Sequence, residues 1–189
     1  DLRSTEPMAG LWLFANNIDV GGLLRKLGVV GNLEASFSEF SLNLVARASR
    51  LGDMLARSEL LGSIGGGLIV LRDPNTQGEA RITIDKGQLR ADPGKPLRWT
   101  LQGALDDVPV AIALETNRAY ELADPRLPLS FKLNAEGAGS RVMLSGNVAR
   151  PIGAELELAL DAGGTRFDHL NKLARASLPP WGPWSATGT

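Results

Sequence analysis

The sequence predicts a mainly β protein built on an antiparallel sheet with one apolar face. Apolar residues recur at every second position through most of the 189 residues, which is the period of a strand with one wet face. Short clusters of Gly, Asp and Pro separate these runs and supply turns. Helical spacing appears only in stretches of about two or three turns, so strands should dominate the fold.

The first half of the chain shows this alternation with interruptions. Apolar residues alternate over 40–48, and β-like runs follow over 64–71 and 80–84. Lys86 and Gly87 then read as a turn, because glycine accepts the backbone angles that tight turns require. A glycine cluster from Gly62 to Gly67 is expected to bend or thin the sheet, since glycine has no side chain to pack.

The second half of the chain contains five consecutive runs that share one design. They cover residues 97–105, 108–114, 127–135, 142–148 and 152–160. Asp106 and Asp107 separate the first two runs as a turn, and Gly137-Ala138-Gly139 joins the third and fourth as a hairpin. Because alternate residues of a strand point to opposite faces, the apolar residues of each run should lie on one side of the sheet.

Two or three short helices are expected at the ends or edges of the sheet. Helical spacing covers 20–27 and 51–61, both followed by a glycine, and 167–174. Strands of about ten residues span roughly 30 Å, so helices this short can cap a sheet but cannot cover its face. A strand pair, a short helix and a Leu-Pro step recur at a spacing of about 50 residues. Such a unit cannot bury its apolar face alone, so residues 1–189 are expected to form one β-rich region in which units of this kind stack on their neighbours.

Composition excludes several classes of function. A formal net charge of −1 gives no basic field for nucleic acid, and no apolar stretch approaches the roughly 20 residues of a membrane helix. The chain has no cysteine and one histidine, His169, too few residues for a Ser-His-Asp triad or a multi-histidine metal site. Asp106 and Asp107 read as a turn, and Glu155 and Glu157 as part of a solvated face. We expect no catalysis, no cofactor, no metal site and no nucleic-acid partner.

The apolar side of the five runs is the candidate site. Helices are too few and too short to cover it, so either the sheet folds onto itself or another molecule fills it. Trp99 is equally compatible with core packing and with contact to a ligand. The residues expected to share this surface are Trp99, Leu101, Ile112, Leu114, Phe131, Leu133, Val142, Leu144, Leu156 and Leu158.

Several segments resemble the C-terminal region of AsmA-family proteins, bacterial relatives of the bridge-like lipid-transfer proteins. The matching features are Ile18-Asp19-Val20-Gly21-Gly22-Leu23-Leu24, Arg50-Leu51-Gly52-Asp53-Met54-Leu55, Ile64-Gly65-Gly66-Gly67, Leu71-Arg72-Asp73-Pro74, Leu101-Gln102-Gly103-Ala104-Leu105-Asp106, Leu127-Pro128-Leu129 and Leu178-Pro179-Pro180-Trp181-Gly182-Pro183-Trp184. The resemblance spans most of the chain, although each motif is loose.

The resemblance implies a larger protein of which residues 1–189 are a single β-rich fragment, and a curved sheet that forms a U-shaped, taco-like trough with an apolar interior. It also implies a location on the periplasmic side of a Gram-negative inner membrane, with an N-terminal membrane anchor absent from this sequence. The function it implies is a lipid-binding conduit that helps phospholipids pass between the inner and outer membranes. Phospholipid acyl chains would then be the ligand, and envelope proteins the partners.

Two other interpretations of the sequence stay open. The chain could be a structural or assembly factor for the outer membrane, with a closed, dry β core whose outer surface contacts partner proteins. A hydrolase with an unrecognised site is the third, and it is disfavoured by the single histidine and the lack of cysteine. Unpaired sheet edges would in addition favour self-association of the fragment.

Overall fold

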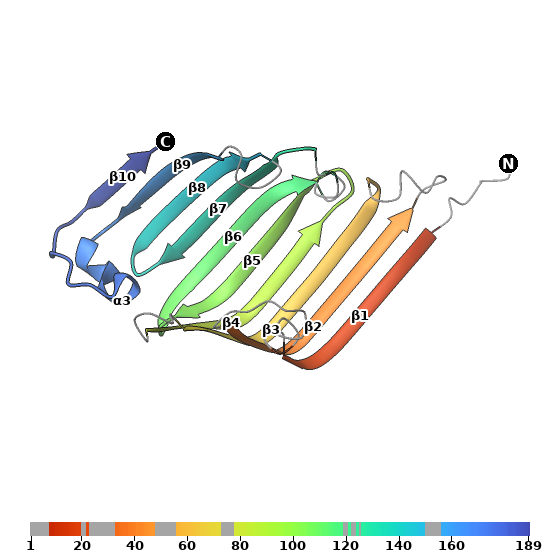
Figure 1. Ribbon diagram of the computed structural model, residues 1–189, viewed down its shortest axis with the longest axis horizontal. Coiled ribbons are helices and arrows are strands. Elements are labelled where there is room, and N and C mark those ends of the chain that lie inside the picture. Colours follow the sequence, from red (N-terminus) through yellow and green to blue (C-terminus); the bar gives the residue numbers. More distant parts are fainter. Residues whose placement is uncertain are drawn as a thin grey trace.

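The computed structural model describes residues 8–19, 22, 33–47, 56–72, 78–118, 121, 124, 126–149 and 156–189 (Figure 1). These residues form ten strands and one short helical segment. The strands are β1 (Met8–Asp19), β2 (Leu33–Arg47), β3 (Ser58–Arg72), β4 (Glu79–Ala91), β5 (Pro96–Leu105), β6 (Val108–Arg118), β7 (Leu129–Gly137), β8 (Ser140–Val148), β9 (Leu156–Gly164) and β10 (Trp184–Gly188).

All ten strands belong to one open sheet in the order of the sequence, and each is antiparallel to its neighbours. β1 and β10 lie at opposite edges of the sheet (Figure 1). The prediction of a mainly β, antiparallel fold is confirmed. Such a meander needs only short connections, because each strand pairs with the one before it in the chain.

Two hairpin turns lie where the sequence places them. Asp106 and Asp107 join β5 to β6 with φ angles of 47° and 65°, and Ala138 and Gly139 join β7 to β8 with φ angles of 51° and 68°. Two consecutive residues with positive φ are typical of the type I′ turn, whose twist matches that of paired antiparallel strands. Asp and Gly tolerate this conformation better than most residues, so the turn chemistry determines both hairpins.

A row of four unpaired residues crosses β1 to β4, and we call Asn17, Ser38, Gly66 and Asp85 the bulge row. They face one another between paired residues on either side, and the register between β4 and β5 shifts by one at Asp85. Asn17 and Gly66 have φ angles of 53° and 56°. Extra residues of this kind bend a strand and increase its twist, and β1 curves sharply near one end in Figure 1.

The bulge row explains one wrong prediction. Lys86 and Gly87 do not form a turn but lie inside β4, where they pair with Gln102 and Leu101 of β5. The extra residue, Asp85, moves the apolar alternation of β4 by one position, so that Ile84 and Gly87 occupy the same face. Read without the bulge, this change of phase looks like the end of a strand.

The helix expected over 51–61 is also wrong in its described part. Residues 58–61 belong to β3, where Leu60 pairs with Leu44 and with Ala91 on the two sides of the strand. The helix was expected because Leu61 continues the helical spacing of Leu51, Met54 and Leu55 in the sequence. Strand pairing on both sides of residues 58–61 outweighs that local preference. The helix expected over 20–27 lies outside the described residues except for Gly22.

The third expected helix is present at the end of the sheet. It consists of a 3₁₀ turn, η2 (Phe167–Leu170), followed by α3 (Asn171–Ala174). Arg175, directly after α3, donates hydrogen bonds to the Asp106 carboxylate and to the Glu79 carbonyl. The segment therefore lies across the strand ends near the β5–β6 turn and the start of β4, which confirms that this helix caps the sheet (Figure 1).

Burial in this sheet is shallow. Among the described residues no large side chain is fully buried, and the most buried apolar ones are mainly small or β-branched. They are Ala35, Ala46, Val70, Ile84, Ala91, Leu97, Val108 and Ala162. The described strands thus form one layer, whose apolar side chains pack against neighbours on the same face rather than against a second sheet.

Candidate functional site

The ten residues predicted to share a surface do lie on one face of the sheet. Residues paired across antiparallel strands point to the same side, so the register assigns each face directly. Trp99 pairs with Leu114, Leu114 with Leu133, and Leu133 with Leu144. Equivalent pairs place the other six on that side, which we call the apolar face: Leu101, Ile112, Phe131, Val142, Leu156 and Leu158.

The apolar face extends far beyond these ten residues. Two neighbouring rows of paired residues cross all ten strands, and every member of both rows is apolar or glycine. The first row is Leu13, Leu42, Gly62, Leu89, Trp99, Leu114, Leu133, Leu144, Leu160 and Gly188. The second row is Ala15, Phe40, Ile64, Gly87, Leu101, Ile112, Ala135, Val142, Ala162 and Ala186.

The side chains of the apolar face are only partly covered. Trp99, Leu133 and Leu144 are half-buried, whereas Leu156 exposes 59% of its surface. A recess of about 60 Å³ opens on this face between β2 and β5, with Gly62 and Gly87 among its lining residues. Apolar side chains of both rows surround it, and it has room for a small hydrocarbon group. They are Phe40, Leu42, Ile64, Leu89, Trp99 and Leu101.

The opposite face is polar over most of the sheet. One of its rows contains Arg90, Arg98, Glu115, Lys132 and Ser145. The Arg98 guanidinium lies 2.8 Å from the Glu115 carboxylate across the strand pair; Arg98 is exposed and Glu115 is half-buried. Exposed pairs of this kind contribute little to stability. We interpret this face as solvated, in agreement with the sequence pattern.

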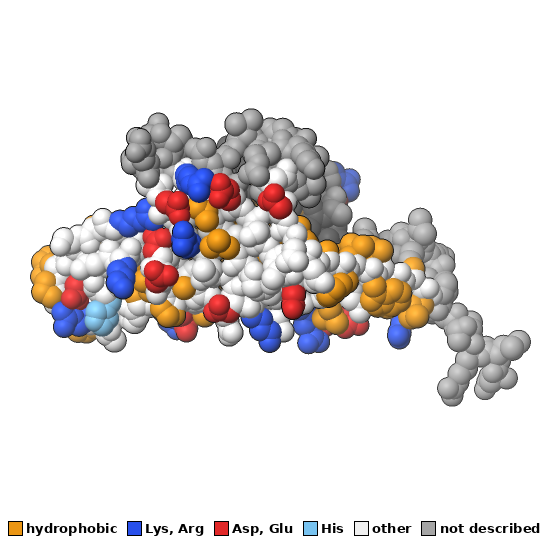
Figure 2. All heavy atoms as spheres, turned by 90° about the horizontal axis from the view of Figure 1, so that it is seen from below, with side chains coloured by type: hydrophobic (Ala, Val, Ile, Leu, Met, Phe, Trp, Pro, Cys, Tyr) orange, Lys and Arg blue, Asp and Glu red, His pale blue; other side chains and the backbone are white. Residues whose placement is uncertain are grey.

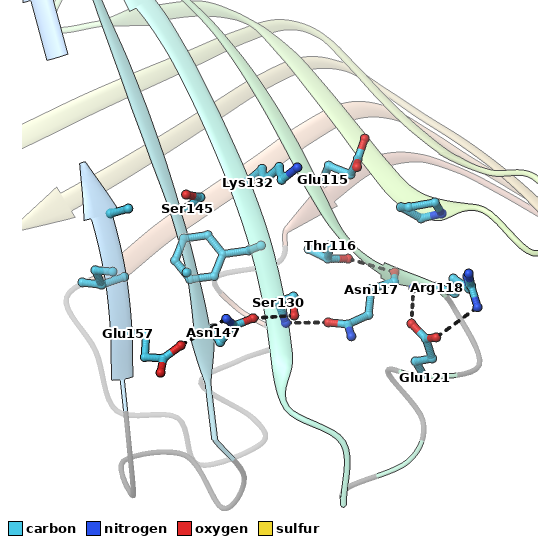
Figure 3. Close-up of a pocket in the computed structure, with 15 residues that line it drawn as sticks. Glu115, Thr116, Asn117, Arg118, Glu121, Ser130, Lys132, Ser145, Asn147 and Glu157 are labelled. Carbon is cyan, nitrogen blue, oxygen red and sulfur yellow. Dashed lines mark hydrogen bonds and ion pairs between the residues drawn. The ribbon is translucent and has the colours of Figure 1, made fainter. Parts of the chain in front are cut away.

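A polar hollow of about 600 Å³ lies along β6 to β9 (Figure 3). Ser130 stands between two asparagines: its backbone N–H donates to Asn117 Oδ1 and its hydroxyl to Asn147 Oδ1, both at 2.6 Å. Asn147 in turn donates to Glu157 at 3.3 Å. The lining residues of the hollow include neither histidine nor cysteine. The hollow offers hydrogen bonds to a polar group but no nucleophile paired with a base.

The carboxylates whose pKa is shifted take part in ion pairs at turns and strand ends. The backbone N–H of Arg81 and the Arg175 guanidinium lower the pKa of Asp106 below its ordinary value. Hydrogen bonds from Arg90 and from Arg166 lower the pKa of Asp92 and Asp168 in the same way. Each carboxylate is fixed in its charged form by a structural partner, so these shifts do not indicate acid–base catalysis.

The described residues do not bring together any other candidate catalytic or metal-binding groups. His169 is exposed on η2, and no three His, Asp or Glu side chains among the described residues are grouped as metal ligands. None of the described helices is long and apolar enough to cross a membrane.

The surface expected from the sequence left out the part of the apolar face that β1 to β4 provide, although β-like runs over 40–48, 64–71 and 80–84 were recognisable. The alternation of Leu11, Leu13 and Ala15 in β1 was a usable signal. It was hidden because Trp12 and Phe14, on the polar side of the same strand, are apolar as well. β10 was missed because its five residues, Trp184–Gly188, are too few to show a period.

The chain matches no family model, no curated protein and no solved structure.

Proposed function

We propose that the chain is a non-enzymatic lipid-binding module, in which acyl chains lie along the apolar face. The observation that carries this proposal is the pair of apolar rows that runs unbroken across ten strands. A solvated protein rarely exposes so long an apolar surface unless another apolar molecule covers it. The resemblance to the AsmA family supports the same ligand and adds a context, which is phospholipid transfer between bacterial inner and outer membranes.

The energetics of hydrocarbon burial suit a surface without directional contacts. Burial of each methylene contributes about 0.8 kcal/mol, so a fully buried acyl chain gains on the order of 10 kcal/mol. A chain that touches the sheet on one side only gains a fraction of this. Such binding discriminates weakly between lipids, because every acyl chain presents the same methylenes, and weak, unselective contact is what a conduit requires.

The trough belongs to this proposal. The bulge row bends β1 to β4, and glycines on the apolar face allow neighbouring backbones to approach closely there. An added Cβ at Gly137 would lie 2.9 Å from the Pro109 carbonyl oxygen, and one at Gly103 or Gly146 would strike a backbone carbonyl of the adjacent strand. Curvature toward the apolar face would bring acyl chains into contact with several strands at once.

A closed, dry β core is the competing interpretation, in which the chain is an assembly factor. The described strands form an open sheet with β1 and β10 at its edges, so no observation in the described part of the chain favours closure. We therefore argue only the lipid-binding function.

Native mass spectrometry after gentle purification tests the proposal. We expect adducts with the masses of phospholipids, which disappear after delipidation and return on incubation with phospholipid vesicles. A protein that stays free of lipid under both conditions would contradict it.

Photocrosslinking in cells then locates the ligand. A photoreactive residue at Leu114 or Phe131 should capture lipid, whereas the same probe at Thr100 or Lys132, on the polar face, should not. Equal labelling of both faces would show that the apolar face is not the binding surface.

A further inference from the structure

The edge strand β1 carries large exposed apolar side chains on both faces, and Trp12 and Phe14 are the most exposed large apolar side chains in the described strands. Trp12 and Phe14 lie on the polar side of the sheet and expose 65% and 72% of their surfaces. Leu11 and Leu13 lie on the apolar face and expose 48% and 47%. Figure 2 shows hydrophobic side chains gathered at this end of the molecule.

Lipid binding on the apolar face does not account for Trp12 and Phe14. Their register partners on β2 are Asn43 and Ser41, and the rest of that side is mainly polar. The Trp12 indole lies over Gly10 on the same strand, where an added Cβ would be 2.5–3.1 Å from ring atoms. The two aromatic side chains therefore form a patch beside an open sheet edge, away from the acyl surface.

Over residues 8–16, before the bulge at Asn17, the edge also lacks the devices that normally prevent strand pairing. Edge strands are usually short, charged or interrupted by proline. β1 has 12 residues, and its sequence, MAGLWLFANNID, contains no proline and no charge before Asp19. Its outer backbone groups have no strand partner in the sheet, and the partner that satisfies a row of such groups is another extended strand.

We propose that β1 is the contact surface of a homodimer, in which it pairs antiparallel with β1 of a second copy. A two-fold axis perpendicular to the sheet near Leu13 would place Trp12 of each copy opposite Phe14 of the other. This contact brings no like charges together, because neither strand carries a charge in that stretch. The apolar faces of the two copies would then continue into each other across the axis.

The available area suits a weak but specific dimer. An aromatic side chain of this size can bury roughly 150 Å² or more, so the four rings offer about 600 Å². With the paired backbones and Leu13, the contact reaches on the order of 1,000 Å², which is the lower limit for a specific interface. The opposite edge, β10, has only five residues and is a poorer match for a strand of 12.

Sedimentation velocity over a concentration series tests the dimer. We expect reversible dimers with a dissociation constant on the order of micromolar. Trp12→Lys and Phe14→Lys should each weaken the dimer roughly ten-fold or more, since a charge would be buried opposite an aromatic ring. Trp181→Lys is the matched control, because Trp181 is 69% exposed but lies outside β1, and it should leave the dimer unchanged.

A cysteine scan fixes the register, since the chain has no cysteine of its own. Leu13→Cys should give the most disulfide-linked dimer on mild oxidation, Leu11→Cys and Ala15→Cys less, and Ala186→Cys on β10 none. A monomer throughout the series would overturn the proposal. So would dimers that Trp12→Lys and Phe14→Lys leave intact, or, in a mixture of the Leu13→Cys and Ala186→Cys proteins, a disulfide that forms only between the two variants.

The dimer proposal and the lipid-binding proposal can be refuted separately. A monomeric Trp12→Lys protein that still captures lipid at Leu114 leaves the lipid-binding function standing. A lipid-free protein that dimerises through β1 leaves the dimer standing.

Discussion

Gly103 illustrates how single residues determine the shape of the apolar face. It lies in β5, paired with Val110 of β6 and with Ile84 of β4. An ideal Cβ added to it would overlap the backbone carbonyl of Thr83 on β4. Glycine is needed here because the two backbones approach on the apolar side of the sheet, next to the bulge at Asp85.

We predict that Gly103→Ala destabilises the protein by about 1–3 kcal/mol, since a carbonyl cannot move aside as a flexible side chain can. Gly188→Ala on β10, where nothing lies within 4 Å of the added Cβ, should be neutral within a few tenths of a kcal/mol. Urea unfolding of the two variants measures the difference. Equal stability of both would mean that the close approach at Gly103 is not present in solution.

Asp106 connects three parts of the chain at one turn. Its Oδ1 accepts the backbone N–H of Arg81 at 2.8 Å, and its Oδ2 accepts the Arg175 guanidinium at 2.6 Å. Both contacts favour the ionised carboxylate and lower its pKa in the folded state. A depressed pKa contributes stability that is complete above the ordinary value of 3.8 and is lost as pH falls through the folded value.

We predict that acidification from pH 6 to pH 3 lowers the urea midpoint less in Asp106→Asn than in the wild type. Asparagine keeps the acceptor for Arg81 and tolerates the φ of 47°, so the variant removes mainly the charge that binds Arg175. Asp107→Asn, at the neighbouring position of the same turn, is the control and should keep the wild-type acid dependence. Identical pH profiles for all three proteins would show that this ion pair has no part in acid stability.

At the scale of elements, the bulge row acts as one device shared by four strands. Asn17, Ser38, Gly66 and Asp85 sit side by side, and each adds one residue to the alternation of its strand. The Ser38 hydroxyl donates to the Gly65 carbonyl at 2.9 Å, which supports the irregular backbone from a neighbouring strand. Four adjacent bulges bend the sheet along a line, whereas one bulge bends only its own strand.

We predict that Asn17→Val destabilises the protein by about 1–2 kcal/mol, whereas Asn17→Gly is neutral or slightly stabilising. A β-branched residue resists the φ of 53° that Asn17 adopts, and glycine accepts it without strain. The Asn17 side chain is exposed, so lost packing does not confuse the comparison. Thermal unfolding measures both, and a valine variant as stable as the glycine variant would argue against a fixed bulge at this position.

Elements with uninterrupted alternation and a recognisable turn were predictable from sequence. β5 to β8 and the Asp106-Asp107 and Gly137-Ala138-Gly139 turns all have this character. The turn expected at Lys86 and Gly87 was wrong because the extra residue at Asp85 reverses the phase that defines the faces of β4, whereas the helix expected over 51–61 was wrong because strand pairing on both sides overrode a helical spacing. The face shared by Trp99, Leu114 and Leu133 was predictable because the alternation of their strands is unbroken over that stretch. The alternation of β4 is broken at Asp85, so the faces of β4 were not predictable.

At the scale of the whole molecule, a single-layer sheet has two costs to offset. Its apolar face needs a cover and its edges need partners. A ligand on the apolar face and a second copy at β1 would each offset one of them, which is why the two proposals are independent yet compatible. The sequence predicted the composition of the face, but exposure at the β1 edge depends on which strands pair, and that follows only from the complete register.

The sharpest test of the lipid-binding surface places one carboxylate on each face of the same strand. Leu133 and Leu144 pair across β7 and β8 in the middle of the apolar face, whereas Asn134, the next residue along β7, is exposed on the polar face. Leu133→Asp or Leu144→Asp should remove lipid adducts in native mass spectrometry. An ionised carboxylate covered by hydrocarbon costs several kcal/mol, far more than one contact with an acyl chain contributes.

The same variants distinguish an open face from a dry core. On an open face water still reaches the new carboxylate, so the proteins should stay folded, with free energies of unfolding within about 1–2 kcal/mol of the wild type. Asn134→Asp, the matched control, introduces the same charge one residue away and should keep both its fold and its lipid. If Leu133→Asp and Leu144→Asp unfold while Asn134→Asp does not, the face is closed in solution and the result favours the assembly-factor interpretation. If both fold and retain lipid, the ligand lies elsewhere.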